Sequence, residues 1–188
     1  MSAVVNPHIR FTYEDYKSLP ESFTKRYELL NGDIVMVPAP TTIHQFIAAN
    51  LEFILQNFVR AHDLGFVLFS PIDVVFGQGN DREVVQPDLL YVSHPRRAII
   101  TEEEIQGAPD LIAEILSPGT ETRDRGYKKH LYGRYGVQEY WIVDPVLRTV
   151  EVYTGEQFDC RQLSGDQALT SSLFPGLEIP LNEVFTIR

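Results

Sequence analysis

The chain has 188 residues, of which 44% are hydrophobic and 22% charged, enough to bury a sizeable core in one domain spanning 1–188. The formal net charge of −10 argues against broad non-specific nucleic-acid binding, although a local basic groove remains compatible with it. The single cysteine, Cys160, excludes an internal disulfide and a cysteine-ligated zinc cluster. No apolar run has the length of a membrane span and no secretion signal is seen, so a cytoplasmic location is expected.

The first third of the chain is predicted to form an arm, a helix, a hairpin and a second helix. Residues 1–10 read as a loose arm, and a short helix is expected over 11–19 with Thr12 as its N-cap. Asn31-Gly32 predicts a hairpin of strands 27–30 and 33–37, which pairs Glu28 with Val35. A long helix is then expected over 42–62, with the apolar stripe Ile43, Phe46, Ile47, Asn50, Leu51, Ile54, Leu55 and Phe58.

Further strands are predicted over 66–69, 72–76 and 84–92, and the last of these carries Asp88 inside an apolar run. Thr101 and Glu104 have the spacing of a capping box, which predicts a short helix there. A second hairpin is expected over 149–163. The tail from residue 171 is expected to pack on the sheet edge as irregular structure.

Residues 109–145 read as strand, helix and strand, and they contain the clearest signal for a site. The apolar run 111–116 is broken only by Glu114, and a lone carboxylate in a buried strand is costly unless something binds it. A helix follows over 124–135 and ends at Gly136. Its periodicity carries Lys128 inward together with Leu131 and Tyr132. The pair of Glu114 and Lys128 is therefore either a functional site or a structural ion pair, and these residues alone leave both open.

Strand geometry selects which acids can work together. Asp110 and Glu114 share one face of one strand, which separates them by about 13 Å, too far to hold one ion. Asp88 and Glu114 lie on strands that can be adjacent, about 4.8 Å apart, so they can share a cation. Two or three carboxylates completed by water suit Mg²⁺ or Mn²⁺, with Glu28 as a further ligand or as a group that orients one. A nearby lysine would stabilise charge on a phosphate.

Five segments in order resemble the Uma2 family of putative restriction endonucleases, which is widespread in cyanobacteria and belongs to the PD-(D/E)xK nuclease superfamily. These segments are YELLNGDIV (27–35), QPDLLYV (86–92), APDLIAEILSPGT (108–120), DRGYKKHLY (124–132) and GVQEYWIVDP (136–145), with a weaker match at 174–177 and Phe185. The resemblance implies an α/β (α+β) fold: a restriction endonuclease-like core, with a mixed β-sheet flanked by helices and preceded by an N-terminal helix and β-hairpin.

The resemblance also implies residue roles. Pro87-Asp88 matches the PD dipeptide, Glu114 matches the acid of the E-x-K element, and Glu28 matches the acid of the N-terminal motif. The lysine place of E-x-K holds Leu116, a departure that points to a lysine relocated to the helix, Lys128. Gln86 would hydrogen-bond near the metal or substrate. Apart from the resemblance, Arg125 and Lys129 lie near Lys128 in the chain and would supply phosphate contacts or form a solvated basic face.

The expected function is hydrolysis of DNA phosphodiester bonds with Mg²⁺ or Mn²⁺, and a homodimer is the matching expectation for the assembly. The alternative is a catalytically silent module that binds a partner through the same cleft. Other polar or aromatic residues have structural interpretations. His44 is expected to contact a helix end, Tyr132, Tyr140 and Trp141 to lie in the core, Glu139 to form a structural salt bridge, and Asp144-Pro145 to form a turn.

Overall fold

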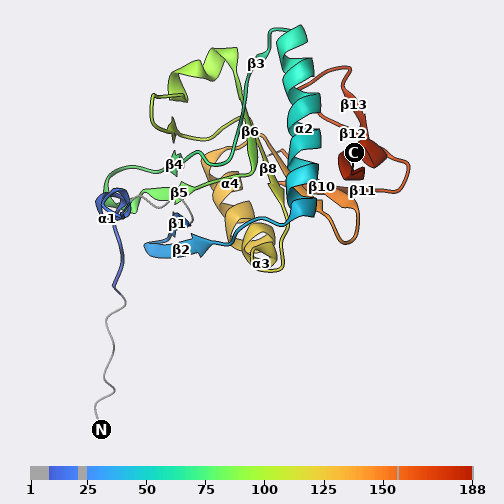
Figure 1. The fold of residues 1–188 in the computed structure, drawn as a ribbon. Coiled ribbons are helices and arrows are strands. Elements are labelled where there is room, and N and C mark those ends of the chain that lie inside the picture. Colours follow the sequence, from blue (N-terminus) through green and yellow to red (C-terminus); the bar gives the residue numbers. More distant parts are fainter. Residues whose placement is uncertain (1–8, 21–24, 156, 188) are drawn as a thin grey trace.

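The computed structural model describes residues 9–20, 25–155 and 157–187, and its centre is a six-stranded mixed sheet (Figure 1). In spatial order its strands are β11 Asp159–Ser164, β10 Thr149–Thr154, β9 Glu139–Asp144, β8 Leu111–Ile115, β6 Leu89–Ser93 and β3 Gly65–Phe69. Only β8 and β9 run parallel, because the helical segment that joins them crosses from one end of the sheet to the other.

A second, five-stranded sheet lies to one side of the first (Figure 1). Its strands are β2 Asp33–Val37, β1 Arg26–Leu30, β5 Glu83–Val85, β4 Val74–Phe76 and β7 Ile105–Gln106. A two-stranded sheet, β12 Ala168–Thr170 with β13 Glu178–Pro180, lies near the C-terminus. Within β1 and β2 Glu28 pairs with Val35, which confirms the predicted hairpin register.

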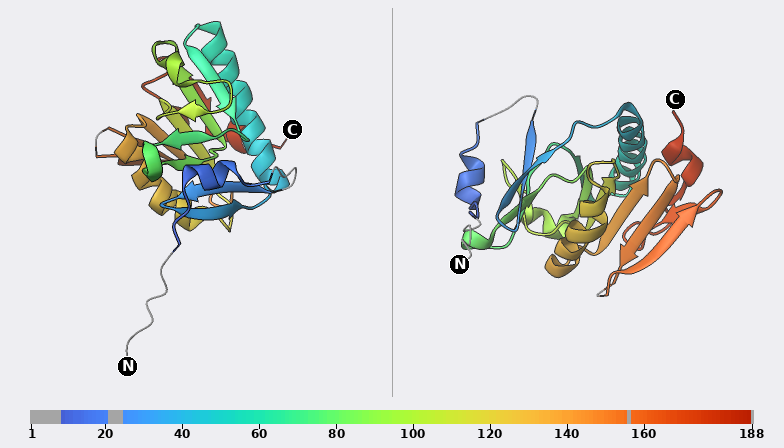
Figure 2. Two further views of the ribbon diagram at one scale, coloured as in Figure 1. Left: turned by 90° about the vertical axis from the view of Figure 1, so that its left-hand side faces the viewer. Right: turned by 90° about the horizontal axis from the view of Figure 1, so that it is seen from below.

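Helices cover both faces of the six-stranded sheet (Figure 2). The helical elements are α1 Tyr13–Lys17, α2 Thr42–Ala61, α3 Glu121–Arg123, the π-helical turn η3 Asp124–Lys128, α4 Lys129–Tyr135 and α5 Leu181–Phe185, with 3-10 turns η1 Gly79–Asp81 and η2 His94–Ile99. The helix predicted over 124–135 therefore begins three residues earlier, at Glu121. It ends as expected at Gly136, whose φ of 80° is left-handed. No helix in the described ranges is both long and apolar enough to cross a membrane.

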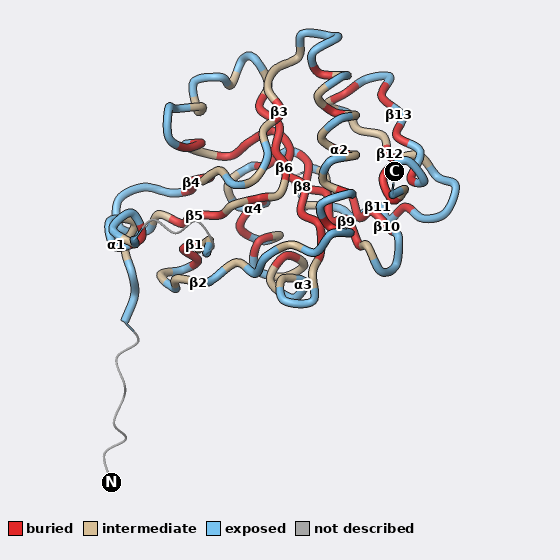
Figure 3. Tube along the Cα trace, viewed as in Figure 1, coloured by how far each residue is buried: buried red, intermediate tan, exposed pale blue. Residues whose placement is uncertain are grey.

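Alternating side chains of the central strands divide the core into two layers. Leu111, Ala113 and Trp141 pack toward α2 and α5. Ile112 and Tyr140, on the opposite face, pack toward α4 and the five-stranded sheet. The central strands are consequently buried on both sides, as Figure 3 shows for β6 and β8. Glu114 has the parity of Ile112, so its side chain is directed to the layer that contains α4.

The predicted strand over 84–92 is wrong as a single element. It breaks at residues 86–88, so that β5 belongs to the five-stranded sheet and β6 to the six-stranded sheet. Proline at position 87 has no N–H for a strand ladder, which is consistent with a break there. The site residue Asp88 therefore lies where the chain passes between sheets.

Three other local predictions need correction. Thr101 and Glu104 bond to each other in a turn before β7 and start no helix, while η2 forms just upstream. The buried stripe of α2 is rotated, because Ile43 and Phe46 are 41% and 38% exposed and His44 is buried. The tail is regular in part, since β13 and α5 pack on the core beside α2.

The expected loose arm, residues 1–10, lies outside the described residues apart from Ile9 and Arg10. The Arg10 Nη2 atom donates to the Asn31 carbonyl oxygen at 3.1 Å, which ties this end of the arm to the first hairpin turn.

Candidate active site

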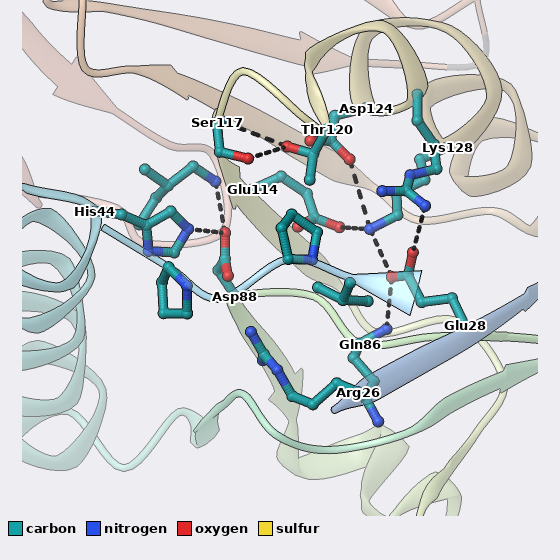
Figure 4. A pocket seen from close by; sticks show the side chains of 15 residues that line it. Arg26, Glu28, His44, Gln86, Asp88, Glu114, Ser117, Thr120, Asp124 and Lys128 are labelled. Atoms are coloured by element: carbon teal, nitrogen blue, oxygen red, sulfur yellow. Dashed lines mark hydrogen bonds and ion pairs between the residues drawn. The ribbon is translucent and has the colours of Figure 1, made fainter. Parts of the chain in front are cut away.

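One buried lysine is the centre of a cluster of carboxylates between the two sheets (Figure 4). The Lys128 Nζ atom lies 2.7 Å from Glu28 Oε1, 2.9 Å from Glu114 Oε1 and 3.5 Å from Asp124 Oδ1. Only 5% of the Lys128 side chain is exposed. The sequence-based prediction that Lys128 points to the same cleft as Glu114 is therefore confirmed.

Neighbouring strands bring the two principal acids together. Leu89 of β6 pairs with Ala113 of β8, so Asp88, which immediately precedes β6, lies next to Glu114 in register. The Asp88 Oδ2 atom accepts a hydrogen bond from the backbone N–H of Ile115 at 2.8 Å. Strand pairing thus fixes the backbone of both acids, and a direct bond from β8 fixes the Asp88 carboxylate.

The first turn of α2 supplies a second contact to Asp88. Thr41 caps this helix by accepting from the backbone N–H of His44 at 3.2 Å, and the His44 Nε2 atom lies 3.0 Å from Asp88 Oδ2. The expected helix-end role of His44 is thus only part of its role, since its side chain also contacts an acid 44 positions away in the chain. No spacing rule could have shown this pairing.

The helical segment after β8 positions three charged groups. The wider π turn η3 carries Asp124 and Lys128, both buried, toward the cavity, and turns of this kind are frequent at functional sites. Arg123, just before it, lies 3.8 Å from Glu28. Tyr132, one turn beyond Lys128, donates its hydroxyl to Glu114 Oε1 at 2.7 Å. Tyr132 is a core aromatic, as predicted, and its hydroxyl also belongs to the cluster.

Burial and crowding shift the proton affinities of this cluster. Burial raises the pKa of Glu114 to about 8, because the charges of Asp124, Asp88 and Glu28 add to desolvation and outweigh the opposing charge of Lys128. Burial also raises the pKa of Asp124. Burial alone would lower the pKa of Lys128, but the carboxylates of Glu114 and Glu28 hold it above its ordinary value. The cluster therefore keeps the Lys128 ammonium charged and favours the protonated form of Glu114 near neutral pH.

The cavity between these groups has a volume of about 30 Å³, room for a water-sized species. The atoms of the cavity that could coordinate a cation are carboxylate oxygens. Two of them, Glu28 Oε2 and Asp124 Oδ1, are buried and have no hydrogen-bond partner. Among the residues described, no three or more His, Cys, Asp or Glu side chains are arranged to hold a metal ion. Mg²⁺ commonly takes only one or two protein carboxylates and fills the remaining positions with water and substrate. The pair Asp88 and Glu114 fits that pattern.

The sequence matches a family model described as "Putative restriction endonuclease", Uma2, over residues 13–182. The chain belongs to the Uma2 family. Two uncharacterized proteins of Synechocystis sp. are similar to it. One, slr1290, is 26% identical over 148 residues, which cover 78% of this chain and 75% of that protein. The other, sll1609, is 23% identical over 161 residues, which cover 84% and 89%.

A solved structure from Anabaena variabilis, described as a putative nuclease belonging to DUF820, has the same fold. It matches with a TM-score of 0.79 and 24% sequence identity, over 93% of this chain and 97% of that chain. The expected mixed α/β (α+β) architecture with flanking helices is thereby confirmed.

Gln86 is the one further predicted Uma2 site residue that lines the cavity. Its backbone N–H donates to Glu28 Oε1 at 3.0 Å and its side-chain amide donates to Asp73 at 2.8 Å. Arg125 is instead bound by Glu121 and Asp144, at 3.2 and 2.9 Å, and also contacts Glu151. Lys129 lies over the Tyr153 ring, 5.1 Å from its centroid. Neither Arg125 nor Lys129 lines the cavity, and their contact with phosphate stays a prediction.

The remaining acids near this region have separate partners. Asp110 accepts from the Ser93 N–H at 2.7 Å and from Arg96 at 3.2 Å, at the opposite end of β8 from Glu114, as strand geometry predicted. Glu139 accepts from the Trp141 ring N–H and from the Ser171 hydroxyl, so the expected salt bridge is replaced by neutral donors. Asp144 ends β9 and caps the following turn.

Proposed function

We propose that this Uma2 chain is a divalent-metal-dependent nuclease that hydrolyses phosphodiester bonds of DNA at the Asp88–Glu114–Lys128 cavity. The observation that carries the proposal is the position of Lys128. Its ammonium lies 2.9 Å from Glu114 although position 116, where E-x-K has its lysine, holds a leucine. The lysine beside the acid is therefore supplied by the helical turn after β8 and not by β8 itself. The description of the family and that of the Anabaena variabilis protein as a nuclease support the same chemistry.

Asp88 and Glu114 are the proposed ligands for Mg²⁺ or Mn²⁺. Such an ion, when bound, polarises a phosphate and lowers the pKa of a bound water. His44 and the Ile115 N–H orient the Asp88 carboxylate, and Tyr132 orients that of Glu114. Glu28 was predicted as a further ligand or as a group that orients one, and its Oε1 atom accepts from Lys128 and Gln86. We assign it the role of holding Lys128.

Lys128 is the proposed stabiliser of negative charge on the scissile phosphate. Its flexible stem allows the ammonium to turn from Glu114 toward a substrate oxygen while Glu28 and Asp124 remain as partners. The low exposure of the cavity strengthens each charge interaction, because little water screens it.

The test is cleavage of supercoiled plasmid DNA and of single-stranded DNA in Mn²⁺. Wild type should cut at least one of them, and the Asp88→Asn and Glu114→Gln variants should each lose cleavage. Glu103→Gln is the matched control, because it removes a carboxylate charge from a side chain that is 75% exposed and does not line the cavity. Wild type that cuts neither substrate, or Asp88→Asn and Glu114→Gln variants as active as Glu103→Gln, would contradict the proposal.

A catalytically silent binding module is the second candidate function. It is favoured by the closure of the site, because Lys128 already has three carboxylate neighbours and the cavity admits only a water-sized species. A structural ion-pair cluster would have the same geometry. Cleavage, and the response of Lys128 variants to metal, separate the two.

A further inference from the structure

The carboxylate cavity adjoins a larger groove, to which no function has been assigned above. This groove has a volume of about 430 Å³ and is lined by the start of α2, the end of β3 and the loop after it. Five residues line both the cavity and the groove, so the two are continuous: Arg26, Val37, Pro40, His44 and Asp88. A substrate chain that reaches Asp88 from outside can therefore lie in this groove.

Among the described residues, Arg26 is the cation of this junction that has no carboxylate partner. Lys128 and Arg123 face carboxylates, whereas Arg26, within the part of the chain that the structure describes, bonds only the Ser70 hydroxyl. It is half-buried, and Figure 4 shows it below Asp88 with no marked partner among the residues drawn. A guanidinium in this position can bind a phosphate in a bidentate manner.

Phe69 lines the same groove and supplies the second feature of a nucleotide site. It is 51% exposed at the end of β3, directly before Ser70, the residue that bonds Arg26. Exposed aromatic rings beside a cation are the common platform for unpaired bases, because every base has a face that can stack. The small side chains of Ala39, Ala48 and Ala49 also line the groove, together with Gln45, Glu52 and Pro71.

The low exposure of the proposed catalytic side chains favours a single-stranded substrate over a duplex. The side chains of Glu114 and Lys128 are 5% exposed, and that of Asp88 is 14% exposed. A stacked duplex holds its phosphates on a stiff rod, whereas an unpaired strand can bend a single phosphate into a recess. The groove volume is within the range of pockets that hold one small ligand such as a nucleotide.

We infer that this groove binds one unpaired nucleotide next to the scissile position, with its phosphate on Arg26 and its base stacked on Phe69. This inference rests on the proposed function and narrows its substrate to single-stranded nucleic acid, either free or at an unpaired stretch of a duplex. It also assigns Arg26 and Phe69 as substrate-binding residues.

The test is equilibrium binding of a dye-labelled thymidine oligonucleotide of roughly ten residues, compared with the same strand paired to its complement. The measurement is fluorescence anisotropy in Ca²⁺ at several salt concentrations. Wild type should bind the single strand more tightly than the duplex. Arg26→Ala should weaken binding and reduce the slope of log K against log salt by about 0.7, the value of one phosphate contact on a single strand. Phe69→Ala should weaken binding roughly 5- to 150-fold, with the slope unchanged.

Matched controls come from α2, outside the groove. Arg60→Ala makes the same charge change at the exposed far end of that helix, and Phe53→Ala removes an aromatic ring that is 69% exposed. Both should bind as wild type does. If Arg26→Ala melts well below wild type, Arg26→Gln replaces it, because glutamine removes the charge and keeps a side-chain N–H donor.

Three results would overturn the inference: no wild-type binding to the single strand, tighter binding to the duplex, or Arg26 and Phe69 variants that match their controls. The same protein preparations are assayed for Mn²⁺ cleavage, which keeps the inference and the proposed function separable. Cleavage without a contribution of Arg26 and Phe69 would leave the function standing and the groove refuted. Binding that depends on both residues, without any cleavage, would leave the groove standing and the nuclease proposal refuted.

Discussion

At the scale of single residues, the cavity is defined by an imbalance of charge. Four carboxylates, those of Glu28, Asp88, Glu114 and Asp124, lie around one buried ammonium, and a further cation, Arg123, lies 3.8 Å from Glu28. Like charges held this close destabilise the folded protein unless a proton or a cation reduces the repulsion. For the same reason, a divalent cation bound in the cavity would reduce the repulsion between these carboxylates.

Lys128→Ala should destabilise the metal-free protein by roughly 3–5 kcal/mol, because it leaves buried carboxylates without their cation. A metal-binding site predicts that Mn²⁺ then restores much of the melting temperature, since the ion replaces the missing positive charge and stabilises the fold by mass action. A purely structural ion-pair cluster predicts the same loss without recovery. Thermal melts with and without Mn²⁺ measure this, and Lys17→Ala, at a side chain 38% exposed, is the control.

The raised pKa of Glu114 predicts how stability changes with pH. The folded protein holds this proton up to about pH 8, whereas the unfolded chain releases it near pH 4.5. Between these values the folded state binds more protons, so the free energy of unfolding should fall as pH rises through this window and level off above it. Glu114→Gln should flatten this dependence. Chelator-treated samples melted across the window test the sign, and a wild type that grows more stable with rising pH would contradict it.

How much of the site could be predicted depends on where each residue stands in the sequence. Asp88, Glu114 and Lys128 were found because each is a charge in an apolar pattern, which burial makes conspicuous. Asp124 begins the predicted helix four residues before Lys128, but nothing local distinguished it from a solvated acid. His44 was assigned only a helix-end contact, because its partner Asp88 is 44 positions away and only the packing of α2 against the strand ends brings them together.

At the scale of elements, two glycines in and after the helical segment 121–135 test how backbone conformation alone affects stability, because neither site adds a packing clash. Gly126 and Gly136 both have open space where a Cβ would stand, but Gly126 lies inside the π turn and Gly136 has a φ of 80°. Gly126→Ala should raise the free energy of unfolding by up to about 1 kcal/mol. Gly136→Ala should lower it by about 1 kcal/mol, because alanine is strained in the left-handed region. Chemical denaturation measures both, and equal effects of one sign would contradict the assigned backbone.

Elements defined by a local rule were predicted well, and elements defined by their neighbours were not. The first hairpin and the stop at Gly136 follow from turn chemistry within a few residues. The break between β5 and β6 was missed because the apolar pattern is continuous through it, although the two halves join different sheets. The side chains of Thr101 and Glu104 do bond as the spacing suggests, but pairing of β7 with β4 directs the chain into a strand instead of a helix.

At the scale of the whole molecule, the site lies where the parts of the fold meet. The five-stranded sheet contributes Glu28, the six-stranded sheet Glu114, and the passage between them Asp88. The helical crossover covers one side with Lys128, and the first turn of α2 covers the other with His44. Because five segments must dock to assemble the cavity, its geometry reports on the entire fold, and a bound ion should stabilise the molecule globally.

The most direct measurement is anomalous diffraction from crystals soaked in Mn²⁺. The account predicts one strong peak coordinated by Asp88 and Glu114, with the Lys128 ammonium turned away from Glu114 and still beside Glu28. Crystals of Glu114→Gln, soaked in the same way, should lack the peak. A cavity without anomalous signal, with Lys128 still bound to Glu114 and manganese only elsewhere on the protein, would contradict the claim that these residues form a metal-dependent active site.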